Sequence, residues 1–158
     1  LQDVSSRLLE LGVAVVGLKL GEQGLYIRTS TDSQRLGESG RAFPDPVHGW
    51  TDRELYIPAF HADVTGTTGA GDCTIAGFLA GILRDLPLEE AAVAAAAAGA
   101  FSVESPDATS SIPDWETMQR RIRSPWQQRE PHIRLPGWQK RANTGIWERS
   151  GISANKTI

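Results

Sequence analysis

The residues best suited to chemistry lie together in one glycine-rich stretch, Gly66-Thr67-Thr68-Gly69-Ala70-Gly71-Asp72. This stretch falls between a segment with strand character and one with helix character, so its glycines predict a turn whose backbone can approach a ligand closely. The start of the following helix would offer unpaired N–H groups and the positive end of the helix dipole. The stretch therefore predicts a binding site for an anion such as a phosphate group.

Two common phosphate-binding motifs are excluded here. The spacing from Gly66 to Gly71 fits the G-x-x-x-x-G of a P-loop, but that motif continues with lysine and this sequence continues with Asp72. The dinucleotide fingerprint G-x-G-x-x-G fails because Thr74 stands where its third glycine is required. A carboxylate at the mouth of an anion site therefore needs another explanation.

Asp72 has two interpretations. As a general base, its carboxylate would accept the proton of a hydroxyl that attacks a phosphate, while the N–H groups of Ala70, Gly71 and Asp72 stabilise charge on the transferring group. One such donor is typically worth ~3 kcal/mol in a transition state. As a structural residue, Asp72 would only cap the helix behind a tight turn. The spacing alone leaves the two interpretations about equally open.

The elements that must position this stretch follow from the pattern of apolar residues. We expect a helix over residues 1 to 11, which ends at Gly12, and then a buried strand over 13 to 20. A turn at 21 to 24 and a second strand at 25 to 27 would complete a hairpin. A long polar loop is expected from 29 to 53, followed by a short strand from 54 to 60.

Three helices are expected in the second half of the chain. The first, 70 to 84, would turn its apolar residues Ile75, Phe78, Leu79 and Ile82 to the core. The second, from about 87 to 103, is nearly all alanine, which favours both helix formation and close packing. The third, 115 to 122, has Asp114 as its expected N-cap residue.

After residue 123 the sequence changes character. Residues 124 to 158 are polar, contain three prolines and show no sustained period, so we interpret them as an irregular tail beside a domain of residues 1 to 123. Trp126, Trp138 and Trp147 are able to stack on bases or sugars, but such residues more often anchor an irregular segment to a core or an interface.

The composition restricts the function classes. A net charge of -3 and a pI of about 5.6 give no electrostatic reason to expect nucleic acid or a membrane surface as a partner. The one cysteine excludes an internal disulfide, which suits a cytoplasmic protein, and neither a signal peptide nor an apolar run of ~18 residues is visible. The chain opens without Met on a helical pattern, as a fragment would, and homo-oligomerisation stays open.

The stretch around Asp72 resembles a known signature. Thr67-Thr68-Gly69-Ala70-Gly71-Asp72, followed by Ala76-Gly77-Phe78, is similar to the C-terminal D-T-x-G-A-G-D signature of PfkB-type (ribokinase-like) carbohydrate kinases. Two flanks support the resemblance: residues 19 to 24 resemble the family's strand-turn segment beside the nucleotide, and residues 91 to 113 resemble the helix and loop that enclose adenine. The resemblance covers about residues 1 to 122. It implies a three-layer α/β fold, with helices over a mostly parallel sheet, of which this chain holds the C-terminal nucleotide-binding part.

The resemblance also implies a reaction. ATP, with Mg²⁺, would donate a phosphate to a hydroxyl of a small sugar or nucleoside. Asp72 would be the base, and Gly69, Ala70 and Gly71 with the Asp72 N–H would form the anion hole. The family's sugar-binding residues lie N-terminal to those present, so this chain alone is expected to be inactive. The nucleotide would be lined by Lys19, Leu20, Gly21, Glu22, Gln23, Gly24, Gly71, Asp72 and Ala96.

A monovalent cation such as K⁺ is implied as well, near Gly66, Thr68, Ser102, Ser105, Asp107 and Ser111. The chain departs from the family at Gly66, where an aspartate is usual, and at Asp107-Ala108, where Gly-Ala is common. Because of these departures, a second hypothesis is that the protein is a non-catalytic or degenerate nucleotide-binding module. The Trp-containing tail supports a third hypothesis, that the protein is an interaction scaffold.

Two reactive residues flank the motif. His61 has no partner residues in the sequence pattern and is interpreted as a strand-end residue. Cys73 follows Asp72 at a helix start, where thiol pKa values can fall, but we interpret it as a small packing residue.

Overall fold

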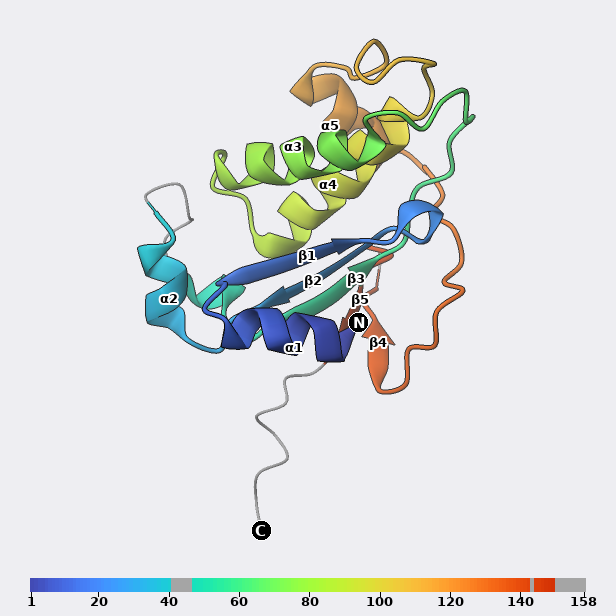
Figure 1. The fold of residues 1–158 in the computed structure, drawn as a ribbon. Helices are drawn as coiled ribbons and strands as arrows, with labels where there is room; N and C mark the ends of the chain where they lie inside the picture. The colour runs from blue at the N-terminus through green and yellow to red at the C-terminus, as the bar shows by residue number, and fades with distance from the viewer. Residues whose placement is uncertain (41–46, 143, 150–158) are drawn as a thin grey trace.

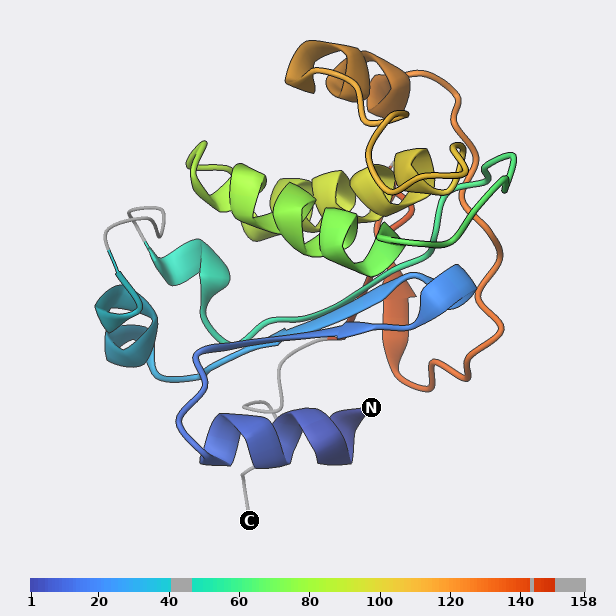
Figure 2. The same cartoon turned by 45° about the horizontal axis from the view of Figure 1, so that its top comes forward.

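Residues 1–40, 47–142 and 144–149 are described by the computed structural model, and they form three layers. Figure 2 shows α1 on one face of the sheet and the pair α3 and α4 on the other, which confirms the expected α/β layering. Within these ranges no helix combines the length and apolar character needed to cross a membrane. The elements are α1 (Gln2–Glu10), β1 (Val15–Lys19), a 3₁₀ turn (Gly21–Gln23), β2 (Leu25–Thr29), α2 (Ser33–Glu38), a second 3₁₀ turn (Val47–Trp50), β3 (Glu54–Ile57), α3 (Ala70–Ile82), α4 (Leu88–Ser102), α5 (Trp115–Arg123), β4 (Trp138–Lys140) and β5 (Trp147–Arg149).

The sheet is antiparallel throughout the described residues, so the expectation of a mostly parallel sheet is wrong for them. Its strand order is β1-β2-β3-β5-β4, and every neighbouring pair runs antiparallel. Antiparallel neighbours need only a short turn, whereas parallel strands need a long crossover. The turn between β1 and β2 is confirmed, but β1 lies at the sheet edge and exposes Gly17 and Lys19, so it is not the buried strand expected.

Glycine is required in the β1–β2 turn. Gly24 has a φ of 101°, and a Cβ at that position would lie 2.1 Å from the carbonyl oxygen of Ile57. The turn is therefore pressed against the end of β3, and Figure 1 shows it at the end of the sheet, beside the helix layer.

Helix α3 packs on α4 through its smallest residues, and the apolar face expected from the sequence is correct only in part, because Ile82 is buried and Phe78 packs against the core. The residues that α3 buries are Cys73, Gly77, Gly81 and Ile82. A Cβ added at Gly77 would lie 2.8 Å from the Ala94 carbonyl oxygen, so the two backbones are in close contact. Ile75 and Leu79, assigned to the core, are 47% and 51% exposed. Because glycine and alanine have small side chains, α3 and α4 can pack closely. The glycine-containing face of α3 is therefore the face that is buried against α4.

The segment from 29 to 53 is not entirely a loop. Helix α2 forms within it because the Asp32 carboxylate accepts hydrogen bonds from the N–H groups of Gln34 and Arg35 and so caps the first turn. The sequence carried this N-cap signal, but the surrounding glycines and prolines obscured it. Residues 41–46 of the expected loop lie outside the described residues.

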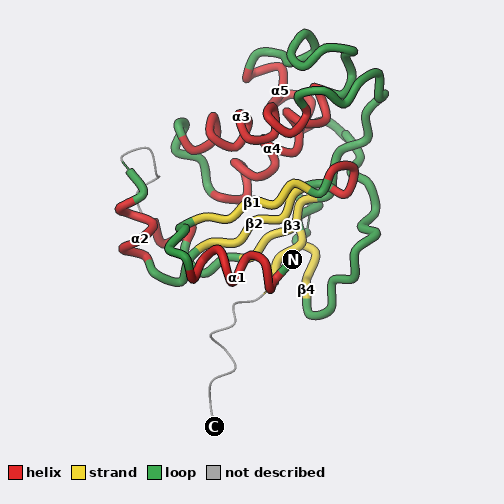
Figure 3. The backbone as a smooth tube through the Cα atoms, viewed as in Figure 1, coloured by secondary structure: helices red, strands yellow, loops and turns green. Residues whose placement is uncertain are grey.

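The tail is more regular than expected, because it contributes β4 and β5 to the sheet. Strand β5 pairs with β3, and the coil that leads from α5 down to β4 is visible as the long loop at the side of the sheet in Figure 3. Glu89 of α4 and Glu148 of β5 each lie within 3 Å of both Arg53 and Arg141. Burial is the largest single influence on Glu89 and would raise its pKa, but the hydrogen bond from Arg53, a backbone hydrogen bond and the charges of Arg53 and Arg141 together lower the pKa. This charged cluster ties the tail to both the sheet and α4.

Candidate active site

The turn before α3 has one geometry that only glycine suits. Gly69 is the N-cap residue of α3 and has a left-handed φ of 78°. A Cβ added there would lie 2.3 Å from the Ala108 Cβ, so both the dihedral angle and the neighbouring loop require glycine.

Two N–H groups at the start of α3 have no acceptor among the described residues. The Ala70 N–H is 3.4 Å from the Thr67 carbonyl oxygen, and the Cys73 N–H donates to the Gly69 carbonyl at 2.8 Å. The N–H groups of Gly71 and Asp72 make no such bond there. The Lys19 ammonium lies over them, 2.5 Å from where a Gly71 Cβ would be. Two free donors, a helix dipole and an ammonium together make a site suited to an anion.

Asp72 stands in the first turn of α3 with its side chain exposed. Its carboxylate makes no hydrogen bond or ion pair with any described residue, and the N-cap position of the helix belongs to Gly69. The capping interpretation therefore lacks the contact that it requires. A carboxylate with free oxygens beside an anion site is available to accept a proton.

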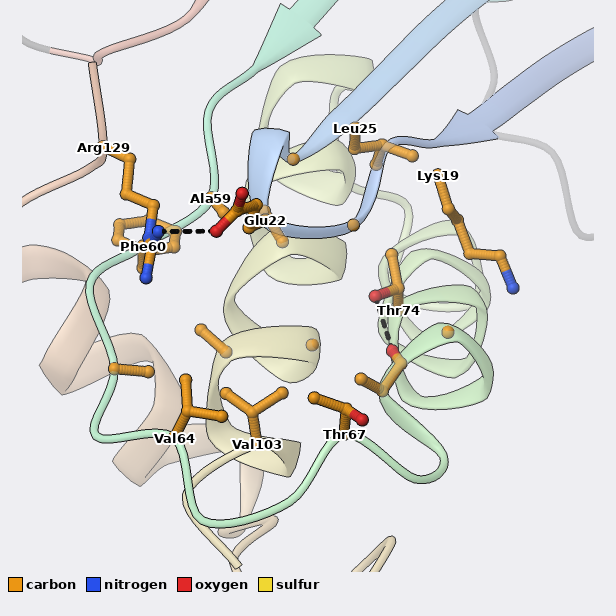
Figure 4. A pocket seen from close by; sticks show the side chains of 18 residues that line it. Lys19, Glu22, Leu25, Ala59, Phe60, Val64, Thr67, Thr74, Val103 and Arg129 are labelled. Atoms are coloured by element: carbon orange, nitrogen blue, oxygen red, sulfur yellow. Dashed lines mark hydrogen bonds and ion pairs between the residues drawn. The ribbon is translucent and has the colours of Figure 1, made fainter. Parts of the chain in front are cut away.

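A cavity of about 420 Å³ lies beside this turn. Figure 4 shows it enclosed by the β1–β2 turn, the start of α3, the small side chains of α4 and the segment that follows β3. Of the residues expected to bind nucleotide, six line it: Lys19, Gly21, Glu22, Gly24, Gly71 and Ala96. A cavity of this volume and mostly apolar lining suits a ligand of nucleotide size.

Three of the expected nucleotide residues, Leu20, Gln23 and Asp72, do not line the cavity. Gln23 is structural: its carbonyl accepts from the Tyr56 hydroxyl and its side chain accepts from the His132 N–H. Asp72 lies on the outer side of the turn, next to the cavity-lining Gly71.

Several cavity residues were missed from the sequence. Gly99 and Ala100 follow Ala96 at helical spacing on α4, so periodicity could have found them. Leu25, Thr74 and Val103 come from β2, α3 and the end of α4, and Thr67 lies in the glycine-rich stretch itself. No local signal marks the others, because loops and the tail bring them in: Ala59, Phe60, Ala62, Val64 and Arg129.

Four of the side chains suggested for a monovalent cation, those of Ser102, Ser105, Asp107 and Ser111, hydrogen-bond within the end of α4 and the loop that follows it. The hydroxyls of Ser102 and Ser111 donate to the carbonyls of Ala108 and Phe101. Asp107 accepts from the N–H groups of Thr109 and Ser110 and from the Ser110 hydroxyl, and the last of these bonds contributes most to lowering its pKa to about 2. None of the six suggested residues lines the cavity.

Gly66 is closely covered by the same loop. A Cβ there would lie 2.8 Å from the Ser105 carbonyl oxygen and 3.0 Å from that of Pro106, so this backbone has no room for an aspartate. The Gly66 N–H is 3.3 Å from the Val103 carbonyl oxygen, so three backbone carbonyls lie close to this residue.

The contacts of His61 and Cys73, the two reactive residues that flank the motif, are those of structural residues. The His61 backbone pairs with the tail and its side chain is exposed. The Cys73 thiol is buried and donates to the Ala108 carbonyl at 3.2 Å, in agreement with a packing role. Within the described residues no three His, Cys, Asp or Glu side chains gather as metal ligands.

The layers and the glycine turn together define an α/β protein of the ribokinase-like class. The chain belongs to the pfkB family of carbohydrate kinases, whose family model matches residues 1–115. The matched range contains the β1–β2 turn, the glycine turn and α4, and ends at the first residue of α5.

Relatives of known sequence or structure agree with this assignment. A sugar kinase from Archaeoglobus fulgidus is 30% identical over 89 residues, which are 56% of this chain and 27% of that protein. The ribokinase of Thermotoga maritima superposes with a TM-score of 0.57 at 27% identity, over 75% of this chain and 33% of the other. The aminoimidazole riboside kinase of Salmonella enterica was solved with aminoimidazole riboside and an ATP analogue. It superposes with a TM-score of 0.55 at 27% identity, over 75% of this chain and 35% of the other. The chain thus spans about a third of the length of these relatives.

Proposed function

We propose that residues 1–158 form the nucleotide-binding part of a kinase that transfers phosphate from ATP to a hydroxyl of a sugar or sugar-like molecule. The observation that carries the proposal is the first turn of α3, where free N–H groups at Gly71 and Asp72 lie beneath the Lys19 ammonium and beside an unpaired carboxylate. Similarity to kinases of sugars and of a riboside supports the substrate class.

In this proposal each group at the turn has one task. The N–H groups of Gly71 and Asp72 and the Lys19 ammonium bind the phosphates and stabilise charge that develops on the transferred group. The Asp72 carboxylate accepts the proton of the attacking hydroxyl. The apolar cavity holds the base and ribose and keeps water from that side of the site.

Two cofactors belong to the proposal. Mg²⁺ would accompany the nucleotide and neutralise phosphate charge. K⁺ would be bound by oxygen atoms near Gly66, where the carbonyl oxygens of Ser105 and Pro106 would lie 2.8 and 3.0 Å from a Cβ at that position. The acceptor sugar is held by residues outside those matched here, because the chain spans about a third of its relatives.

A second candidate function is a nucleotide-binding module without catalysis. The absence of a side chain at Gly66 favours it. The two candidates differ only in whether a hydroxyl is phosphorylated, since both require the anion site at α3.

The isolated chain should bind ATP or ADP weakly and phosphorylate no sugar. The anion site and the cavity are formed by described residues, whereas the family resemblance implies that the sugar-binding residues lie N-terminal to them. Titration calorimetry with each nucleotide and a coupled kinase assay with ribose measure the two parts. Steady sugar phosphorylation by residues 1–158 alone, or no nucleotide binding at millimolar concentration, would contradict the proposal.

Gly71→Val should weaken nucleotide binding by at least about tenfold, which is 1.4 kcal/mol. A side chain at Gly71 would occupy the space in front of the free N–H groups, where it meets only the flexible end of Lys19. The fold should therefore tolerate the change while the anion site does not. Calorimetry with ADP gives the affinity, and thermal unfolding gives the stability.

The matched control for this variant is Ala76→Val, which places valine on an exposed part of the same helix. Its ADP affinity should equal that of the unmodified chain. If Gly71→Val also kept full affinity, the turn would be structural only.

A further inference from the structure

The tail forms part of the cavity wall although it lies outside the residues that match the family. Residues 126 to 129 run beside residues 58 to 61: the His61 N–H donates to the Gln127 carbonyl at 2.9 Å, and the Arg129 N–H donates to the Ala59 carbonyl at 2.8 Å. Phe60 and Gln128 form the bridge between the two segments. Ala59 and Phe60 line the cavity, so the tail fixes this wall by backbone pairing.

Aromatic packing holds the same wall from behind. Trp126 stacks on Phe60 with ring centroids 4.3 Å apart, and its indole N–H donates to the His61 carbonyl. The Arg121 guanidinium lies 3.9 Å from the centre of the Trp126 ring, and it makes two 2.6 Å hydrogen bonds to Glu104. Phe60 is thus supported by the stacked Trp126 and Arg121 side chains. This packing fixes the neighbouring residues of the tail against the cavity wall.

Arg129 is the cavity residue that the tail supplies. Its guanidinium bonds to Glu22 at 3.1 Å, but the Glu22 side chain is 72% exposed, and an ion pair so open to water contributes little. In Figure 4 Arg129 lies beside Phe60 and Glu22, and Lys19 lies on the opposite side of the cavity. The two cations therefore mark two ends of the cavity, and only Lys19 is at the anion site.

We propose that Arg129 binds the base and ribose end of the nucleotide, so that the tail takes part in nucleotide recognition. This inference rests on the proposed function. With the phosphates at Lys19 and the start of α3, a nucleotide that fills the cavity extends its base toward Phe60, Val64 and Val103. A planar guanidinium beside that wall can stack on a base or donate to its ring nitrogens, whereas Glu22 competes only weakly for it.

The test separates the two ends of the ligand by using adenosine, ADP and inorganic tripolyphosphate as probes for the 158-residue chain. Arg129→Ala should weaken the binding of adenosine and of ADP about tenfold and leave the affinity for tripolyphosphate unchanged. Lys19→Ala should have the opposite effect: it should lose affinity for tripolyphosphate and for ADP and keep its affinity for adenosine. The control Arg134→Ala removes the same charge from an exposed position in the tail and should change none of the three affinities.

Thermal unfolding distinguishes recognition from support of the wall. The pairing of the Arg129 N–H with Ala59 uses the backbone, so Arg129→Ala should unfold at the same temperature as Arg134→Ala. Arg129→Gln, which keeps a long side chain, should lose adenosine affinity to a similar degree. Adenosine and ADP affinities within twofold of the control in both variants would overturn the inference and leave the proposed function standing. Failure of the unmodified chain to bind any probe would overturn both.

Discussion

Replacing Asp72 by asparagine should slow phosphate transfer by about 10²–10⁴-fold and leave folding and nucleotide binding intact. Asparagine has the size of aspartate but cannot take up the proton of the attacking hydroxyl. The Asp72 carboxylate makes no hydrogen bond with any described residue, so asparagine removes no structural contact. Nucleotide affinity should stay equal or rise, since a negative charge near the phosphates is gone.

The rate is measured as kcat in the full-length kinase to which these residues are proposed to belong, with affinity from calorimetry and stability from thermal unfolding. Asp3→Asn is the matched control, because Asp3 is an exposed acid in the first turn of α1. Both variants lose a similar interaction with a helix dipole, about 0.3–1 kcal/mol. A near-normal kcat in Asp72→Asn would remove Asp72 as the base. Loss of stability and of activity in parallel would restore the capping interpretation.

Gly77→Ala should lower the free energy of unfolding by about 2 kcal/mol, although alanine is the better helix former. The added Cβ would lie 2.8 Å from the Ala94 carbonyl oxygen and 2.8 Å from the Ala98 Cβ, and the backbone atom cannot move aside without shifting α4. Separation of the two helices would also disturb Ala96, Gly99 and Ala100, which line the cavity. Thermal unfolding should show a decrease of roughly 4–8 °C in Tm.

The control is the same substitution in a helix with open space. A Cβ at Gly37 of α2 meets nothing within 4 Å, so Gly37→Ala should stabilise the protein by ~0.5–1 kcal/mol. The two changes should therefore have opposite signs. Stabilisation by Gly77→Ala equal to that of Gly37→Ala would show that the α3–α4 contact is loose.

The sequence by itself determined the elements that depend on local chemistry. Runs of apolar or alanine residues and their caps predicted α1, α3, α4 and α5 to within a few residues, and the glycines predicted the turns at 21 to 24 and at 66 to 71. The short G-A-G-D stretch was enough to indicate the family and to single out Asp72, because a turn and the helix start behind it are formed by neighbours in the chain.

Tertiary structure alone decided which faces are buried and what completes the site. Ile75 and Leu79 look like core residues by hydrophobicity, yet Gly77 and Gly81 face α4, because close approach of two backbones excludes large side chains. The tail has no sustained period, yet β5 pairs with β3, and residues 126 to 129 pair with the backbone of residues 58 to 61. Arg129 reaches the cavity through that pairing with a segment seventy residues earlier, as in the contact of Gln128 with Pro58. No pattern in the sequence around Arg129 records a partner so distant, because hydrogen bonds between separate backbone segments do not depend on side-chain type.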